Sequence, residues 1–148
     1  MQLKLIAAIV VLLLASLVKA GCTSQSTTQE QVSVKTTQVT APQAISSPYT
    51  YTPKQGDEFV MFNVTVTNQG SNTILKHTTF FTVHDSNGNA YGISQASNDN
   101  SIAGYPNNVN INPGDKVTGL LVFEVPQNAK LVNMVYNDES NSNVTVNL

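Results

Sequence analysis

The chain has 148 residues, a formal net charge of −2 and only 11% charged residues. Nucleic-acid-binding domains usually carry a basic face, and 7 Lys and Arg residues against 9 Asp and Glu residues do not supply one, so we expect no nucleic-acid partner. The single cysteine excludes an intramolecular disulfide, so a folded core would depend on packing alone.

The first 21 residues are predicted to be a signal peptide. Lys4 precedes an apolar run, Leu5–Val18, which is too short to cross a bilayer comfortably because spanning needs about 20 residues. The run leads into Ala20-Gly21-Cys22, which resembles the lipobox of prokaryotic lipoproteins. The resemblance implies that the Cys22 thiol is lipidated and that Cys22 becomes the mature N-terminus.

Lys19 leaves a second interpretation open, because a lipobox has an apolar residue at that position. Val18-Lys19-Ala20 also fits the small-x-small pattern of ordinary signal peptidase, and cleavage there would release a secreted protein that begins at Gly21. We expect lipidation. It would make the membrane a partner, through an N-terminal lipid anchor, and would place the protein outside the cytoplasm.

Residues 22–47 are predicted to form a flexible tether between this anchor and a domain at 48–148. The segment is rich in Ser, Thr and Gln and has almost no large apolar side chains, so it cannot bury enough surface to offset the entropy of ordering. Val32–Thr40 nevertheless alternates between apolar and polar residues. A strand added to the edge of the domain is therefore the competing interpretation of that stretch.

From residue 48 onward the pattern predicts short strands separated by turns. After the strand in Asn112–Pro126, the clearest is Glu58–Asn68, with an apolar face made by Val60, Phe62, Val64 and Val66. Asn87-Gly88 is a strong hairpin signal. Further strands are expected at Tyr49–Thr52, Thr79–His84, Ala90–Ile93, Leu131–Tyr136 and Asn143–Leu148, and Val109–Ile111 leads into the stretch that begins at Asn112.

Asn112–Pro126 has the clearest turn-and-strand pattern of the chain. Pro113-Gly114 predicts a tight turn, a strand follows from Val117, and Pro126 ends it by removing a backbone donor. Odd-numbered positions are expected to face a core, while Leu120 and Val122 are apolar exceptions on the other face. The series of short strands predicts an all-β fold, an immunoglobulin-like antiparallel β-sandwich of about seven to nine strands.

Three segments resemble a known family: Phe59–Gly70, Phe81–Tyr91 and Asn112–Pro126. Their order and spacing are similar to those of a prokaryotic domain family of unknown function, found in secreted and lipoprotein antigens and similar to the mycobacterial immunoprotective extracellular antigens. The resemblance implies an exported immunoglobulin-like sandwich without established catalytic activity. It supplies no functional residues that could be carried over to this chain.

The sequence offers little for catalysis or metal binding. His84 and Asp85 are adjacent on a predicted strand and would point to opposite faces, and no Gly-x-Ser-x-Gly motif is present. Asp85-x-Asn87-x-Asn89 resembles the start of a calcium loop, but its glycine is displaced and Ala96 stands where a bidentate Glu is needed, so we interpret it as a hairpin turn. We expect no enzyme activity, no metal site and no cofactor.

The remaining candidates lie on loops and edges. The sequons at Asn63 and Asn143 allow glycosylation. Possible binding residues on or near the Ser94–Asn108 loop are Tyr91, Asn98, Asp99 and Tyr105, and we expect that deleting this loop leaves the fold intact. The predicted function is binding or adhesion at the cell surface to an unknown protein or envelope partner. A carrier or sensor of solutes or metal ions is the alternative, and a hydrolase is the least favoured.

Overall fold

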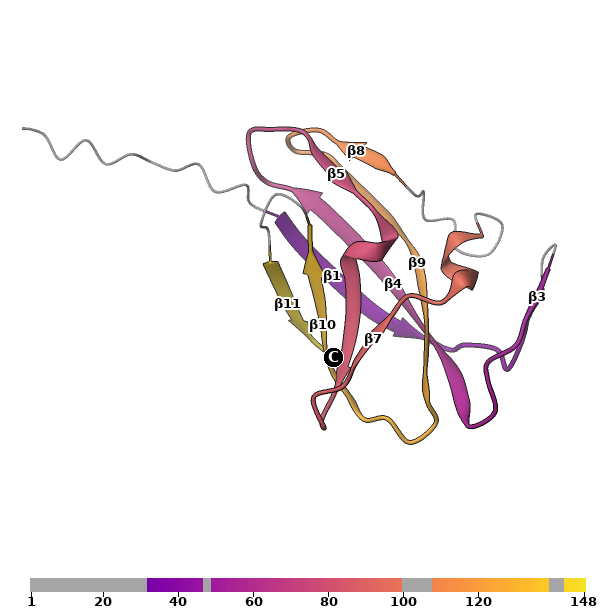
Figure 1. Cartoon of the computed structure of the whole chain (residues 1–148). Helices are drawn as coiled ribbons and strands as arrows, with labels where there is room; N and C mark the ends of the chain where they lie inside the picture. Colours follow the sequence, from indigo (N-terminus) through magenta and orange to yellow (C-terminus); the bar gives the residue numbers. More distant parts are fainter. Residues whose placement is uncertain (1–31, 47–48, 100–107, 139–142) are drawn as a thin grey trace, which may run out of the picture.

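The computed structural model describes residues 32–46, 49–99, 108–138 and 143–148 (Figure 1). Its elements are β1 (Val32–Val39), β2 (Ile45–Ser46), β3 (Thr50–Tyr51), β4 (Asp57–Asn68), β5 (Ile74–Lys76), η1 (Thr78–Phe80), β6 (Phe81–Asp85), β7 (Ala90–Gly92), η2 (Gln95–Asn98), β8 (Val109–Ile111), β9 (Lys116–Pro126), β10 (Leu131–Asn137) and β11 (Asn143–Asn147). The two η elements are short 3₁₀ turns. Within these ranges no helix has the length and apolar character needed to cross a membrane.

Two antiparallel sheets form the sandwich. One has the order β1-β4-β9 and the other β11-β10-β6-β7, and the pairs β2-β3 and β5-β8 extend from them (Figure 1). This confirms the predicted immunoglobulin-like β-sandwich. The described residues contain eleven strands, more than predicted, because β1, β2, β5 and β8 were not among the strands expected from the pattern.

The main core lies between the two sheets, where the alternation predicted it. Phe62 from β4 and Phe123 from β9 meet edge to face at 5.9 Å between ring centroids. Phe81 and Tyr136 meet at 5.0 Å on the facing sheet. These rings pack with aliphatic side chains and hold the sheets together. The buried core residues are Val34, Val60, Phe62, Val64, Val66, Ile74, Phe81, Val83, Ile111, Leu121, Phe123, Val125, Met134 and Tyr136.

A second cluster on the outer face of β4 and β9 explains the apolar exceptions. Val122 is completely buried there with Phe59 and Met61, and Leu120 packs against them. Ile45 from β2 and Ala96 from η2 cover this face. The sheet β1-β4-β9 is therefore buried on both faces where β2 and η2 cross it, which is why the alternation in β9 is imperfect.

The tether prediction is wrong from Val32 onward. β1 pairs with β4 along its whole length, from Val32 opposite Asn68 to Val39 opposite Met61. The competing interpretation of Val32–Thr40 as an edge strand is therefore correct, since its alternate side chains reach the core and its backbone groups gain partners in the ladder. Residues 1–31, with the signal-peptide prediction and Cys22, lie outside the described residues.

Two turns at the end of the sandwich are joined by one buried side chain. In the turn after β8, the Asp115 amide donates to the Asn112 carbonyl (3.0 Å) and Gly114 has φ 83°, which gives the type II turn that Pro113-Gly114 predicted. The Asn68 side chain is completely buried and donates to the carbonyls of Ile111 (2.9 Å) and Asn72 (2.6 Å). It therefore connects the end of β4 to the start of this turn.

Candidate functional site

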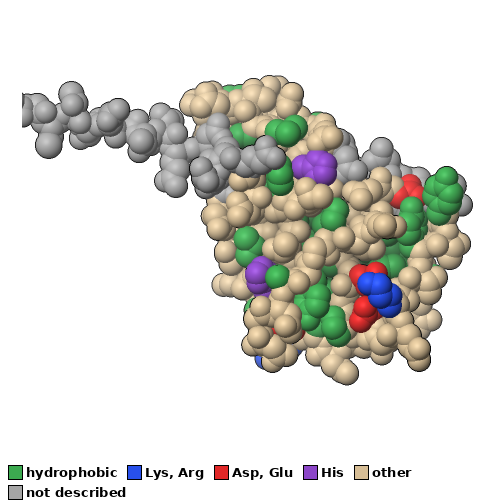
Figure 2. Space-filling model, in the orientation of Figure 1, with side chains coloured by type: hydrophobic (Ala, Val, Ile, Leu, Met, Phe, Trp, Pro, Cys, Tyr) green, Lys and Arg blue, Asp and Glu red, His purple; other side chains and the backbone are tan. Residues whose placement is uncertain are grey.

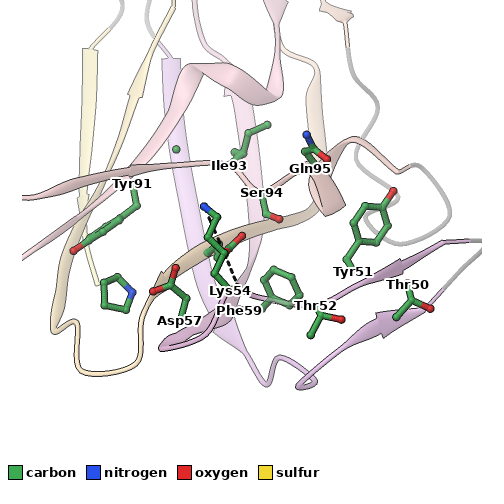
Figure 3. Close-up of a pocket in the computed structure, with 13 residues that line it drawn as sticks. Thr50, Tyr51, Thr52, Lys54, Asp57, Phe59, Tyr91, Ile93, Ser94 and Gln95 are labelled. Carbon is green, nitrogen blue, oxygen red and sulfur yellow. Dashed lines mark hydrogen bonds and ion pairs between the residues drawn. The ribbon is translucent and has the colours of Figure 1, made fainter.

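A groove lies where β7 and β9, the end strands of the two sheets, separate. Ile93 forms an isolated bridge with Phe123, and the Ser94 amide donates to the Val122 carbonyl (2.8 Å). Below this bridge the groove has a volume of about 730 Å³ (Figure 3). Its lining residues are Thr50, Tyr51, Thr52, Lys54, Asp57, Phe59, Tyr91, Gly92, Ile93, Ser94, Gln95, Glu124 and Pro126.

Two tyrosines flank the groove, with Phe59 between them (Figure 3). The Tyr91 hydroxyl donates to Asp85 Oδ2 (2.8 Å), and the Tyr51 hydroxyl donates to Asp99 Oδ2 (3.4 Å). The hydrogen bond to Asp85 raises the pKa of Tyr91, whereas burial, followed by the charge of Asp99, raises the pKa of Tyr51. The short bond fixes the Tyr91 ring at its hydroxyl end, whereas the longer one holds Tyr51 more weakly, and both phenols keep their protons at neutral pH.

Asp85 fixes Tyr91 through the β6-β7 hairpin. Its carboxylate accepts from the Asn89 side chain and from the Asn87 and Asn89 amides, each at 2.9 Å. These bonds, the Asn89 side chain first, lower the pKa of Asp85 to about 2. Gly88 alone in the turn has a positive φ, and its amide donates to the Asp85 carbonyl (3.1 Å), as in a type I turn followed by a bulge. The hairpin interpretation of this motif is confirmed.

The charged residues of the groove come from the β3-β4 turn, the first residue of β4 and the end of β9. The Lys54 amide donates to Glu124 Oε1 (2.9 Å), and Lys54 Nζ lies 4.0 Å from the same oxygen. With the lysine side chain 84% exposed, this ion pair contributes little stability. The half-buried Asp57 carboxylate makes no hydrogen bond or ion pair with another described residue, and its charge helps to raise the pKa of Tyr91.

The turn η2 forms the wall of the groove beside β9 and completes the backbone bonding of that strand. The buried Ser97 hydroxyl donates to the Val122 carbonyl (2.8 Å) and accepts from the Val122 amide (2.6 Å). Neighbouring Ser94 and Gln95 thereby reach the groove. The expectation that the Ser94–Asn108 loop can be deleted without harm is wrong for this part, because deletion would leave the Val122 amide unpaired.

The structure places only some of the predicted binding residues at the groove. Tyr91 lines the groove, and Asp99 lies behind it as the acceptor for Tyr51. Asn98 does not line the groove; its side chain accepts from Thr78 Oγ1 (3.2 Å). Tyr105 lies outside the described residues. The sequence pattern missed Tyr51 and Phe59 as site residues. Tyr51 lies in the strand expected at Tyr49–Thr52, but nothing in the sequence placed that strand in one groove with Tyr91.

The predicted glycosylation sites and the histidines lie away from the groove. Asn63 and Asn143 are both exposed, on β4 and β11, and modification there stays a prediction. His77 Nδ1 accepts from the Thr79 amide (3.1 Å) and caps η1, while His84 Nε2 lies 3.2 Å from Thr82 Oγ1. Among the residues with described positions, no three His, Cys, Asp or Glu side chains gather as metal ligands would.

Lys76, which directly precedes His77 in the chain, is completely buried. Lys76 is the last residue of β5, opposite Val109 of β8. Burial disfavours its charged form and lowers its pKa to about 7. The lysine therefore titrates near neutral pH, and the stability of the fold depends on its protonation.

Comparison with known proteins gives a family and a fold. A model for the domain of unknown function DUF4352 matches residues 26–145. The structure resembles that of MPT63, a secreted protein from Mycobacterium tuberculosis, with a TM-score of 0.58 and 13% identity over 81% of this chain and 85% of that one. This confirms the family resemblance inferred from the sequence.

Two structures from Bacillus subtilis are also similar. The candidate lipoprotein ycdA has a TM-score of 0.58 and 19% identity over 81% of this chain and 38% of its own. The yjhA protein has a TM-score of 0.55 and 17% identity over 81% of this chain and 92% of its own. No curated protein matches the sequence. Because these sequence identities are below 25%, the similar structures support a shared sandwich fold and nothing more.

Proposed function

The chain belongs to the DUF4352 family, whose function is unknown, and from that premise we propose that it is a non-enzymatic binding module of the cell surface. The observation that carries the proposal is the groove of about 730 Å³ between β7 and β9. Its size lies within the usual range for ligand sites, and Tyr91 is fixed in orientation before any ligand arrives.

The lining of the groove supports binding and not catalysis. Its acids, Asp57 and Glu124, have no histidine or cysteine beside them in the groove lining. Ser94 lines the groove too, but its hydroxyl accepts from the Ala96 amide (3.4 Å), and among the described residues it makes no hydrogen bond with Asp57, Glu124 or a histidine. A nucleophile without a base to activate it does not form the nucleophile–base pair of a hydrolase.

The location outside the cytoplasm is proposed from the N-terminal segment. The apolar run Leu5–Val18 and the lipobox-like Ala20-Gly21-Cys22 support export and lipidation. Fractionation of cells that express Cys22→Ser tests the anchor: the protein should leave the membrane fraction or accumulate as a precursor. Lys19→Leu, which brings the segment closer to a lipobox, should stay in the membrane. A Cys22→Ser protein that remains anchored at the mature mass contradicts the lipid anchor.

Site-specific photo-crosslinking in the native host tests binding by the groove. A photoreactive amino acid is placed at Thr52, which is exposed and lines the groove, or at Thr37, which is exposed on β1 and does not. We expect discrete adducts from Thr52 and none from Thr37. Equal adducts from both positions, or no adduct from Thr52, contradict the proposal. A thermal-shift screen of solutes and metal ions tests the alternative carrier function.

A further inference from the structure

Negative charge predominates around the groove. The carboxylates of Asp57 and Glu124 line it, and those of Asp85 and Asp99 lie behind its two tyrosines. Among the described residues that line it, Lys54 is the one cation. Figure 2 shows a face of the molecule on which acidic and basic side chains lie side by side among apolar ones. Four carboxylates and a single exposed ammonium favour a ligand with positive charge.

The tyrosines are arranged to attract such a ligand. Their hydroxyl protons point to Asp85 and Asp99, which do not line the groove, so the phenols do not offer those protons to a ligand. Donation to a carboxylate also leaves a phenol ring richer in electrons. A cation near the face of an aromatic ring is stabilised by the ring quadrupole, and the effect grows when water is excluded.

Asp57 is the acid with capacity for a new ion pair. Glu124 already accepts from the Lys54 amide, and Asp85 and Asp99 accept from the tyrosines. The Asp57 carboxylate is half-buried and has no such bond with the described residues. Asp57 and Tyr91 both line the groove, so a single ligand in it can meet the carboxylate and the ring (Figure 3). A carboxylate that has lost part of its water gains most from a cationic partner.

We propose that this groove binds a lysine or arginine side chain of an extended polypeptide partner, with Asp57 as the counter-ion and Tyr91 as the ring beside the cation. The proposal rests on the binding function proposed above and specifies its ligand. The groove, at about 730 Å³, is much larger than one ammonium or guanidinium group. Thr50, Thr52 and Gln95 line its remainder and offer hydrogen bonds to a peptide backbone.

Calorimetric titration with blocked peptides tests this proposal. The full chain, purified in detergent, receives acetyl-Thr-Val-Xaa-Val-Thr-amide, in which Xaa is lysine, arginine, norleucine or glutamate. We expect the lysine and arginine peptides to bind roughly fivefold or more tightly than the norleucine peptide, as a cation–π contact with a partly exposed ion pair allows, and the glutamate peptide to bind most weakly. Raised salt should reduce the difference between them.

Variants identify the groups responsible. Asp57→Asn should remove most of the preference for lysine over norleucine, while Asp115→Asn, the same change on an exposed turn, should keep it. Lys54→Gln should strengthen binding of the lysine peptide, because a competing cation is removed. Tyr91→Leu should weaken it more than Tyr91→Phe, which keeps the ring. A circular dichroism spectrum of each variant verifies that the sandwich is intact.

Several results overturn the proposal. A cation held by Asp57 is rejected if all four peptides bind equally or if none binds. It is also rejected if the preference for lysine survives Asp57→Asn. Binding of n-butylammonium as tightly as the lysine peptide rejects a polypeptide partner in favour of a small organic cation. In each case the crosslinks from Thr52 decide separately whether the groove binds a partner, so the two proposals can fail independently.

Discussion

Ser97→Ala is expected to destabilise the fold far more than removal of one hydroxyl from a surface turn would. The Ser97 hydroxyl accepts from the Val122 amide (2.6 Å) and donates to the Val122 carbonyl (2.8 Å) in completely buried surroundings. The carbonyl keeps the Ser94 amide as a partner, but the Val122 amide loses its acceptor. A buried donor without a partner costs about 1–3 kcal/mol and the second bond adds about 1, so we expect a loss of about 2–4 kcal/mol.

Urea denaturation followed by circular dichroism measures this loss as a lower midpoint with an unchanged m-value. Ser94→Ala is a matched control, since the Ser94 hydroxyl makes only a long, partly exposed bond to the Ala96 amide (3.4 Å) and its removal should cost less than about 1 kcal/mol. If Ser97→Ala costs no more than Ser94→Ala, then η2 does not complete the bonding of β9.

Three further changes test the buried polar groups. Asn68→Ala removes bonds to Ile111 (2.9 Å), Asn72 (2.6 Å) and Gly70 (2.9 Å) and should cost about 2–4 kcal/mol in the same assay. Because burial lowers the pKa of Lys76 from 10.5 to about 7, the unfolded chain binds more protons between these values, and stability should rise from pH 7 to 9.5 by up to about 1.4 kcal/mol per pH unit. Lys76→Met should lack this rise, and an equal rise in both proteins contradicts the assignment. The pKa of Asp85 falls from 3.8 to about 2, so the stability that its ionised carboxylate contributes to the fold is complete above pH 4 and is lost towards pH 2. The stability of Asp85→Asn should therefore depend less on pH over that window.

The fold was largely predictable because its strands alternate. The even positions of Glu58–Asn68 and the odd positions of Val117–Val125 face the core as their spacing requires. The prediction failed for β1 because Val32 and Val34 lie among Thr, Ser and Gln, a composition also typical of disordered segments. An edge strand needs few apolar side chains when a central strand supplies its backbone partners, and sequence composition does not report that pairing.

The groove was predictable only at Tyr91. Tyr51 precedes it by 40 residues and Glu124 follows it by 33, and their meeting depends on where two sheet edges separate. Asp57, at the start of β4, lines the groove together with Tyr91 of β7, and the two meet there only in the tertiary structure. Local patterns specify strands and turns, whereas this site is made by tertiary contacts between their ends.

The pairing of β1 with β4 also limits how far a membrane-anchored form could extend. With the strand beginning at Val32, nine residues, 23–31, separate it from Cys22. Ten peptide steps reach at most about 35 Å when fully extended and roughly 18 Å as a random coil. A domain lipidated at Cys22 would therefore lie close to the headgroups, and its groove would meet partners at the membrane surface and not far out in the envelope.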